Sequence, residues 1–144
     1  MALKSSTGLK NAVLATSSFK AALNGGKVRI FAGALPADAD AAETGTLLCE
    51  VSLNGTATGL TFAAAAAAGT ISKAAAEVWS GTNVATGTAT HYRFVATGDT
   101  GALSTSEARL QGSVGLIGAD LNISNTNLTS GAPQTIDYYT ATLL

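Results

Sequence analysis

The sequence predicts a mainly β protein, an antiparallel β-sandwich or barrel preceded by a short N-terminal helical segment. After Gly26, apolar residues recur at every second position in at least six segments, whereas the first 23 residues show spacings of three and four. Gly, Asn, Asp or Pro stands at nearly every junction, and no helical pattern separates the strand candidates. This order disfavours an α/β fold. We expect one structural domain, with an N-terminal helical arm at 1–26 and a β-sandwich at 27–144.

The helical arm is predicted from about Ser6 to Leu23. Its apolar positions are Leu9, Ala12, Val13, Ala15, Phe19, Ala22 and Leu23. Ser17 or Ser18 is suited to be the N-cap of a second short helix, because a serine hydroxyl accepts a hydrogen bond from a free N–H of the first turn. The run Asn24-Gly25-Gly26 is typical of a helix end.

The β body is predicted to open at 27–33 and to continue at 46–53, where Leu47, Cys49, Val51 and Leu53 share one face. Asn54-Gly55 is a strong hairpin signal and predicts a returning strand at 58–64. Further strands are expected at 70–73, 76–80, 88–97, 107–115, 120–129 and 134–143. The six alanines at 63–68 are too few for an independent helix, so we expect an extended or turn-like connection.

The composition describes a protein with few charges. Only 12% of the residues are charged, and Ala, Gly, Thr and Ser make up 77 of the 144 residues. A small, neutral surface loses little desolvation energy when another protein covers it. The same composition suits a rigid thermostable shell or an ordinary secreted β domain. No apolar run approaches the roughly 20 residues of a membrane span, and we interpret the N-terminus as mature sequence rather than a signal peptide.

Residues for catalysis or metal binding are scarce. The alternation in 88–97 places Tyr92 and Phe94 in the core and predicts that His91 is exposed together with Arg93. Cys49 is expected to be a buried structural thiol. The sequence contains no nucleophile-elbow, P-loop or dinucleotide-binding motif. We therefore expect no enzymatic activity, no catalytic residue and no cofactor.

The acidic stretch at 31–51 is the best candidate for a metal site. Asp38, Asp40 and Glu43 could offer oxygen ligands to calcium, but the stretch lacks the further acidic or amide position and the glycine of the EF-hand pattern. Pro36 and Gly45 bracket it as loop residues. The preferred interpretation is a solvated connection between two strands, without a metal.

Basic residues are concentrated near the N-terminus. Five of the eight, Lys4, Lys10, Lys20, Lys27 and Arg29, precede the first acidic residue, Asp38. One interpretation is that the helix packs on the β body and its lysines are solvated. The other is that these five residues dock on an acidic neighbouring protein. Nucleic acid is a weaker partner, because the lysines alternate with apolar residues and the whole chain has a net charge of −1.

The order of these segments resembles a known family. A short N-terminal helix, Asn-Gly, "VRIFAGALPADADAAETGTLL", a hairpin, "VWSG", "GTATHYRFVATGDTGA" and a closing "IDYY" are similar to small virion proteins of tailed bacteriophages. The most specific part is Phe31 to Ala42, where Phe31 stands in place of an expected tyrosine. The resemblance covers nearly the whole chain.

The resemblance implies a capsid cement, or decoration, protein with a jelly-roll fold behind its helical segment. Such a protein would bind the major capsid protein after the shell expands, would self-associate as a dimer or trimer, and would need neither nucleic acid nor membrane. It would be located on the capsid surface of the virion, after assembly in the cytoplasm of the bacterial host.

Two other classes stay open. One is a tail, baseplate or fibre component that touches a host receptor. The other is an enzyme or a free carbohydrate-binding module. A sugar-binding face needs exposed aromatic residues, for which Trp79, Tyr139 and Phe31 are the candidates, although Trp79 is better suited to the core or an interface.

Overall fold

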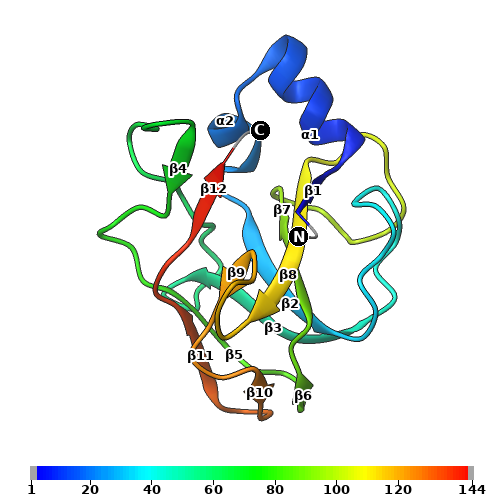
Figure 1. Ribbon diagram of the computed structural model, residues 1–144, viewed down its shortest axis with the longest axis vertical. Helices are drawn as coiled ribbons and strands as arrows, with labels where there is room; N and C mark the ends of the chain where they lie inside the picture. Colours follow the sequence, from blue (N-terminus) through cyan, green and yellow to red (C-terminus); the bar gives the residue numbers. More distant parts are fainter. Residues whose placement is uncertain (1–2, 143–144) are drawn as a thin grey trace.

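The computed structural model describes residues 3–142 and shows a mainly β protein with a short helical segment near the N-terminus (Figure 1). This confirms the predicted fold class at that level. Almost all strand pairs are antiparallel, and the pair β8–β9 is parallel. Within the described residues, no helix is long and apolar enough to cross a membrane.

In chain order, the helices and strands are β1 (Lys4–Ser5), α1 (Thr7–Asn11), the π-helical segment η1 (Ala12–Thr16), α2 (Phe19–Leu23), β2 (Lys27–Ala32), β3 (Thr46–Leu53), β4 (Thr70–Ser72), β5 (Trp79–Thr82), β6 (Gly87–Thr88), β7 (His91–Val95), β8 (Arg109–Gly115), β9 (Leu121–Asn122), β10 (Asn127–Leu128), β11 (Pro133–Ile136) and β12 (Thr140–Thr142).

Serine N-caps begin both α-helices. The Ser6 hydroxyl accepts from the Leu9 N–H at 3.1 Å, and the Ser18 hydroxyl accepts from the Ala21 N–H at 3.1 Å. The predicted restart of the helix at Ser17 or Ser18 is therefore confirmed at Ser18. Leu9 and Leu23 are buried in the core, and β1 pairs with β8, so the N-terminal segment contributes to the body of the fold.

The main sheet has the strand order β1-β8-β7-β2-β3-β5-β11, with β9 beside β8. β2 lies at its centre and pairs with both β3 and β7. A register shift between Ile30 and Phe31 places Ile30 opposite Cys49 and Phe31 opposite Leu47, so one residue of β3 is skipped. This bulge explains why Leu48 is buried beside Cys49, against the strict alternation expected from the sequence.

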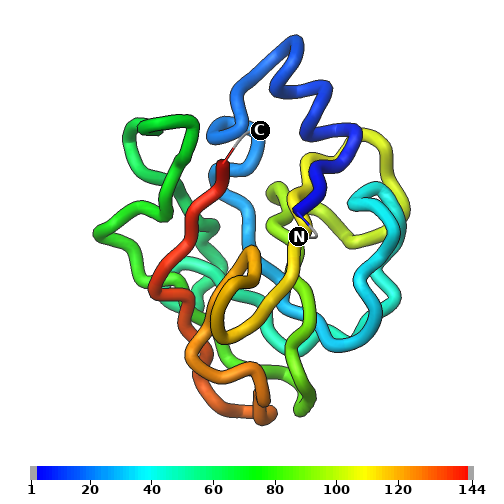
Figure 2. The backbone as a smooth tube through the Cα atoms, in the orientation of Figure 1, coloured from blue at the N-terminus to red at the C-terminus, as the bar shows by residue number. Residues whose placement is uncertain are grey.

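One face of the main sheet carries the hydrophobic core. Val28 and Phe94 are register partners on this face, and an aromatic cluster packs there. The rings of Phe62 and Phe94 lie 5.2 Å apart, and those of Trp79 and Tyr139 lie 5.6 Å apart. The small sheet β4–β12 and the helix α2 lie on this side of the molecule (Figures 1 and 2). Core burial of aromatic side chains is a main source of stability.

The opposite face of the sheet is covered by two long loops. Residues 33–45, between β2 and β3, and residues 96–108, between β7 and β8, run along the right-hand side of the view in Figure 1. Because loops rather than water cover it, this face holds buried side chains although its sequence pattern is polar. It contains the candidate site described below.

The Asn54-Gly55 turn is present, but its returning strand is not. Asn54 and Gly55 have φ angles of 54° and 69°, and the Thr56 N–H donates to the Leu53 carbonyl at 3.0 Å, as in a two-residue hairpin turn. The following residues form only isolated bridges, Gly26 with Leu60 and Phe62 with Lys73. The strand predicted at 58–64 is wrong, because β5 occupies the position beside β3.

The alanine tract forms no helix, as predicted. It ends in a turn in which Ala67 and Thr70 exchange two backbone hydrogen bonds of 2.9 Å. Ala68 and Gly69 occupy the turn with φ angles of 52° and 73°. Ala64 to Ala68 are exposed, so the tract presents a small apolar surface next to β4.

Candidate functional site

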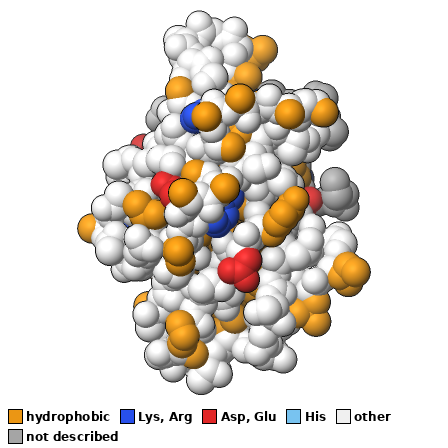
Figure 3. Space-filling model, turned by 90° about the vertical axis from the view of Figure 1, so that its left-hand side faces the viewer, with side chains coloured by type: hydrophobic (Ala, Val, Ile, Leu, Met, Phe, Trp, Pro, Cys, Tyr) orange, Lys and Arg blue, Asp and Glu red, His pale blue; other side chains and the backbone are white. Residues whose placement is uncertain are grey.

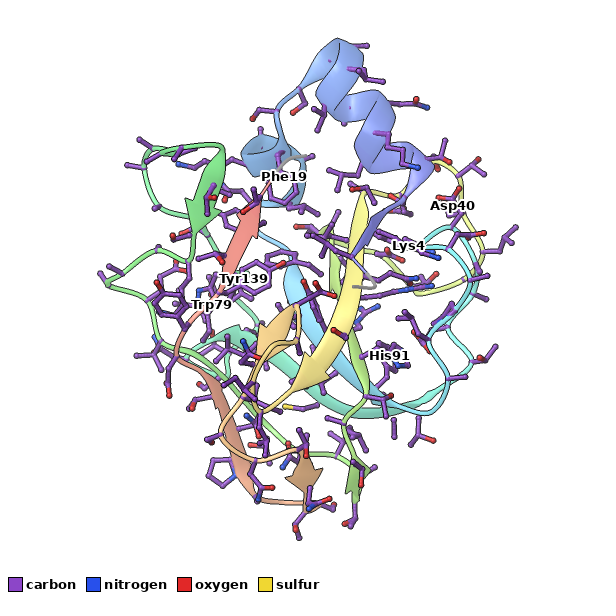
Figure 4. The ribbon with its side chains drawn as sticks, in the orientation of Figure 1. Lys4, Phe19, Asp40, Trp79, His91 and Tyr139 are labelled. Carbon is purple, nitrogen blue, oxygen red and sulfur yellow. The ribbon has the colours of Figure 1, made fainter. Side chains whose placement is uncertain are left out.

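A cluster of buried polar side chains lies between the main sheet and its two covering loops. Arg93 on β7 and Arg109 on β8 are each 1% exposed, and His91 and Gln111 are fully buried. They share the face opposite the aromatic core, since Arg93 is the register partner of Arg29 and of Gln111. Figure 4 places His91 and Asp40 on the loop side of the sheet and Trp79 and Tyr139 on the other.

Arg109 and Asp99 form the centre of this cluster. Arg109 Nε donates to Asp99 Oδ2 at 2.6 Å, and Nη2 donates to Oδ1 at 2.8 Å. Burial alone would raise the pKa of the Asp99 carboxyl, but the hydrogen bonds from Arg109 and from the Gly101 N–H outweigh it, and the pKa lies below its ordinary value. Arg109 also donates to the carbonyls of Ala39 and Ala102, which ties both loops to β8.

Backbone carbonyls of the loop at 33–45 accept hydrogen bonds from the side chains of Arg93 and Gln111. Arg93 Nη2 donates to the Asp38 carbonyl at 3.2 Å, Arg93 Nε donates to Gln111 Oε1 at 3.0 Å, and Gln111 Nε2 donates to the Pro36 carbonyl at 2.9 Å. Arg93 Nη1 and Glu43 Oε2 are buried and have no hydrogen-bond partner among residues 3–142, although Glu43 Oε2 lies 3.8 Å from Arg93 Nε. The cluster is thus an ion-pair network with most of its hydrogen bonds made.

His91 corrects the prediction of an exposed histidine. Its Nε2 lies 3.0 Å from Glu43 Oε1, its Nδ1 lies 3.0 Å from Thr90 Oγ1, and its ring stacks on Phe31 at 5.4 Å. Burial alone would raise the pKa of the Glu43 carboxyl, but the hydrogen bonds from His91 and the Gly45 N–H lower it below its ordinary value. Alternation predicted exposure only because it assumed that water covers this face.

The three carboxylates of the acidic stretch do not converge. Asp38 is exposed and accepts from the Ala41 N–H, while Asp40 accepts from the hydroxyl and N–H of Thr7 in α1 and Glu43 points to His91. The hydroxyl hydrogen bond from Thr7 is the main cause that lowers the pKa of Asp40. Residues 3–142 contain no group of three or more His, Cys, Asp or Glu side chains able to hold a metal ion. The stretch is a loop, as predicted. Glu43 and Asp40, however, are not simply exposed to water: Glu43 attaches the loop to His91 on β7, and Asp40 attaches it to Thr7 in α1.

This buried cluster is suited to a structural role. His91 and both arginines are shielded from solvent, so a substrate has no access to them without movement of the loops. Cys49, the single cysteine, is also buried, and burial raises the pKa of its thiol to about 11, far from a reactive thiolate. The prediction of a buried structural thiol is confirmed.

Four of the five basic residues proposed for docking have partners within the chain. Lys4 donates to the Ala37 carbonyl at 2.5 Å, and Lys20 donates to the Ala63 carbonyl at 2.9 Å. Lys27 and Arg29 both pair with Glu50, at 3.3 Å and 2.9 Å. Lys10, at the end of α1, is exposed and makes no hydrogen bond or ion pair with any described residue. The structure does not gather the five into one patch, which leaves Lys10 as the available cation.

An apolar groove lies between the helical arm and the small sheet β4–β12. Its volume is about 380 Å³, within the usual range for ligand pockets. Val13, Phe19 and Lys20 line one side, and Ala66, Gly69, Ile71 and Ala141 line the other. Phe19 lies beside β12 in Figure 4, and Figure 3 shows that the side of the molecule carrying β4 has few charged side chains. Within residues 3–142, β12 pairs with β4 alone.

The exposed aromatic and aliphatic residues differ from those suggested by the sequence. Trp79, Tyr139 and Phe31 are all buried, which confirms the core interpretation of Trp79 and excludes all three from a sugar-binding face. Tyr138 is instead 78% exposed, and Leu14 in η1 is 83% exposed. Tyr138 follows Asp137 in the connection between β11 and β12. Because this connection is not a strand, the alternation of apolar and polar residues could not predict that Tyr138 is exposed.

The comparisons with known proteins add no assignment: no family model, no curated protein and no solved structure matches this chain.

Proposed function

We propose that this chain is a structural protein of a tailed-bacteriophage virion, a cement protein that binds the outer surface of the assembled capsid and stabilises it. In this proposal the fold is a jelly-roll-like β-sandwich, and the protein performs no catalysis and needs no cofactor. The support comes from the sequence similarity centred on Phe31 to Ala42, together with the physical properties of the surface and interior described above.

The apolar groove beside β12 is the observation that carries the proposal. Its partner would be an extended segment of the major capsid protein, which would add to β12 by antiparallel pairing and place small apolar side chains against Ile71 and Ala141. Lys10 is exposed on the arm and Lys20 lines the groove, so the favoured segment carries acidic side chains. The neutral surface nearby costs little to desolvate.

The interior supports a role in bearing load. The arm, the two long loops and the sheet are fastened to one another by hydrogen bonds: Ser6 donates to the Glu107 carbonyl at 2.7 Å, Thr7 donates to the partly exposed Asp40, and the buried Arg109 donates to both loops. Segments distant in sequence are therefore held together, and the buried hydrogen bonds of Arg109 are little weakened by water. A protein that reinforces a shell against packaged DNA requires such rigidity.

Self-association as a dimer or trimer belongs to the same proposal. A symmetric cluster across a capsid axis would let one protein bridge several capsid subunits. Leu14 in η1 is 83% exposed, and we propose it as a contact between copies. Such a contact would join small apolar areas without burying unpaired charges.

The test is binding to capsids that lack this protein. Purified protein is mixed with expanded capsids of the phage that encodes it, and sedimentation and microscopy at residue resolution locate it. Ala66→Arg, in the exposed wall of the groove, is expected to abolish binding, whereas Val84→Arg, at an exposed residue between β5 and β6 that does not line the groove, is expected to bind normally. Absence of the protein from wild-type capsids would overturn the proposal.

A tail or fibre component with a receptor-binding role is the second candidate. It is favoured by Tyr138, which projects from a hollow of about 320 Å³ that Asp137, Lys73 and Ser72 also line. An exposed tyrosine offers an apolar ring with a polar hydroxyl, a combination that is enriched at interfaces. Location of the protein in the tail, together with loss of host adsorption in a Tyr138→Ala phage, would favour this candidate over the cement protein.

A further inference from the structure

The chain contains two Asn-Gly dipeptides in very different surroundings. They are Asn24-Gly25, at the end of α2, and Asn54-Gly55, in the turn after β3. In unfolded chains the two would have nearly the same reactivity, since glycine follows asparagine in both. Any difference between them in the folded protein therefore comes from the structure.

Asn24-Gly25 is held by the fold. The Gly25 N–H donates to the Leu60 carbonyl at 2.8 Å, and the Asn24 side-chain oxygen accepts from the Phe62 N–H at 3.2 Å. Both residues are half-buried. The backbone nitrogen of Gly25 is thus occupied, and the Asn24 amide group is fixed by a second hydrogen bond.

In Asn54-Gly55, the Gly55 backbone nitrogen and the Asn54 side-chain amide are not engaged in hydrogen bonds with the described residues. Both residues are exposed, and the hydrogen bonds of the turn use the Asn54 N–H, which donates to the Val78 carbonyl at 2.8 Å, and the Thr56 N–H. Among the described residues, neither the Gly55 N–H nor the Asn54 side chain has a hydrogen-bond partner. A Cβ placed on Gly55 would meet nothing closer than 3.8 Å, so the side of Gly55 that a Cβ would occupy is not packed against other residues.

We propose that Asn54 is a site of spontaneous deamidation in the folded protein and that Asn24 is protected. The Gly55 backbone nitrogen attacks Cγ of Asn54, an N–Cγ bond forms, and the Cγ–Nδ2 bond breaks. The proton lost by the Gly55 nitrogen leaves with the amide group as ammonia. Water then opens the resulting succinimide at either carbonyl, which yields aspartate or isoaspartate at position 54.

The reaction changes both charge and backbone. Each event adds one negative charge at an exposed turn of a chain whose net charge is −1. Isoaspartate also inserts one carbon into the main chain of a two-residue turn, in which Asn54 and Gly55 both require positive φ angles. The turn next to β5 is thereby altered without any enzyme, whatever the function of the protein.

The two sites can be compared within one unmodified molecule. Trypsin cleaves after Lys20, Lys27, Arg29 and Lys73, so Asn24 and Asn54 are on separate peptides, 21–27 and 30–73. The full chain is incubated in mildly alkaline buffer at physiological temperature, then digested, and mass spectrometry follows the replacement of the amide NH₂ by OH in each peptide. The Asn54→Ser variant confirms that the change in peptide 30–73 belongs to Asn54.

The expected result is that Asn54 reacts at least about tenfold faster than Asn24, because an opening that breaks two hydrogen bonds lowers the reactive population of Asn24 by roughly tenfold to thirtyfold. In denaturant the two rates should converge. Equal rates in the folded protein, faster reaction at Asn24, or an Asn54 that reacts only after unfolding would each overturn the proposal.

Discussion

Arg109 and Asp99 are joined by two parallel hydrogen bonds of 2.6 Å and 2.8 Å, and both side chains are buried between the main sheet and its covering loops. The pair connects β8 to the loop at 96–108, and the carbonyls of Ala39 and Asp40 extend it to the loop at 33–45. A buried bidentate pair of this kind fixes the positions of the segments that it joins.

Arg109→Met should destabilise the protein by about 3–5 kcal/mol, because the Asp99 charge would stay buried without its partner. Chemical denaturation measures the change in the free energy of unfolding. Lys27→Met is the control, since the described partner of Lys27 is the partly exposed Glu50 and the loss of this pair should cost about 0–1 kcal/mol. An equal change in the free energy of unfolding for the two variants would show that the buried Arg109–Asp99 pair stabilises the protein no more than an exposed pair does.

His91→Ala should destabilise the protein by about 2–4 kcal/mol, because it leaves Glu43 buried beside Arg93 and removes the ring stacked on Phe31. The exposed Asp38→Asn change should stay within about 0.5 kcal/mol. Thermal unfolding of both variants provides the measurement. A neutral His91→Ala would mean that the loop at 33–45 does not cover this face in solution.

Stability should fall in acid. The pKa values of Glu43 and Asp99 are lower in the folded protein than their ordinary values of 4.5 and 3.8, so unfolding is accompanied by proton uptake in this range. Their contribution is complete above the ordinary values and is lost as the pH falls toward the folded values. Thermal unfolding midpoints measured between pH 7 and pH 2 should begin to fall below about pH 4.5, and Glu43→Gln should flatten that slope. A midpoint that rises in acid would contradict the assignment.

Ala68→Gly should stabilise the protein by up to about 1 kcal/mol. Ala68 has a φ of 52°, which costs a residue with a Cβ about 1–2 kcal/mol, and glycine avoids this cost while losing some chain entropy. Ala65→Gly, in the same exposed tract, should instead be neutral or destabilising. Denaturant titration of the two variants compares them directly, and destabilisation by Ala68→Gly would show that the turn is different in solution.

In the proposed function, Lys10→Glu should weaken binding to the capsid, because Lys10 is exposed and forms no hydrogen bond or ion pair with residues 3–142. The charge of Lys10 also lowers the pKa of Asp40, so a small loss of stability should accompany the change. The effect on binding should be larger at low salt, where screening is least. Binding of Lys10→Glu and Lys10→Gln to capsids at two salt concentrations separates charge from packing. Removal of the first 23 residues is an unsuitable test, since Leu9 and Leu23 belong to the core. Unchanged binding by Lys10→Glu would exclude a docking role for this residue.

Local features were determined by the sequence itself. The serine caps at Ser6 and Ser18, the end of α2 before Gly25, and the Asn54-Gly55 turn all depend on interactions within four residues. The positions of β2, β3, β4, β7 and β8 also followed from alternation, because backbone geometry places successive side chains on opposite faces. The single strands predicted at 120–129 and at 134–143 are wrong, since each segment contains two short strands that belong to different sheets.

The tertiary structure decided which faces are buried and which segments meet. Period-two alternation assigned His91 and Arg93 to solvent, but residues 33–45 and 96–108 fold over that face and bury both. Likewise, the sequence placed 58–64 beside β3, whereas β5 holds that position. Coverage by a loop and pairing between distant strands depend on contacts across dozens of residues, which local periodicity does not encode. For that reason the sequence alone determined the helical caps, the turn and several strands, while the buried ion-pair network and the groove beside β12 came from the tertiary structure.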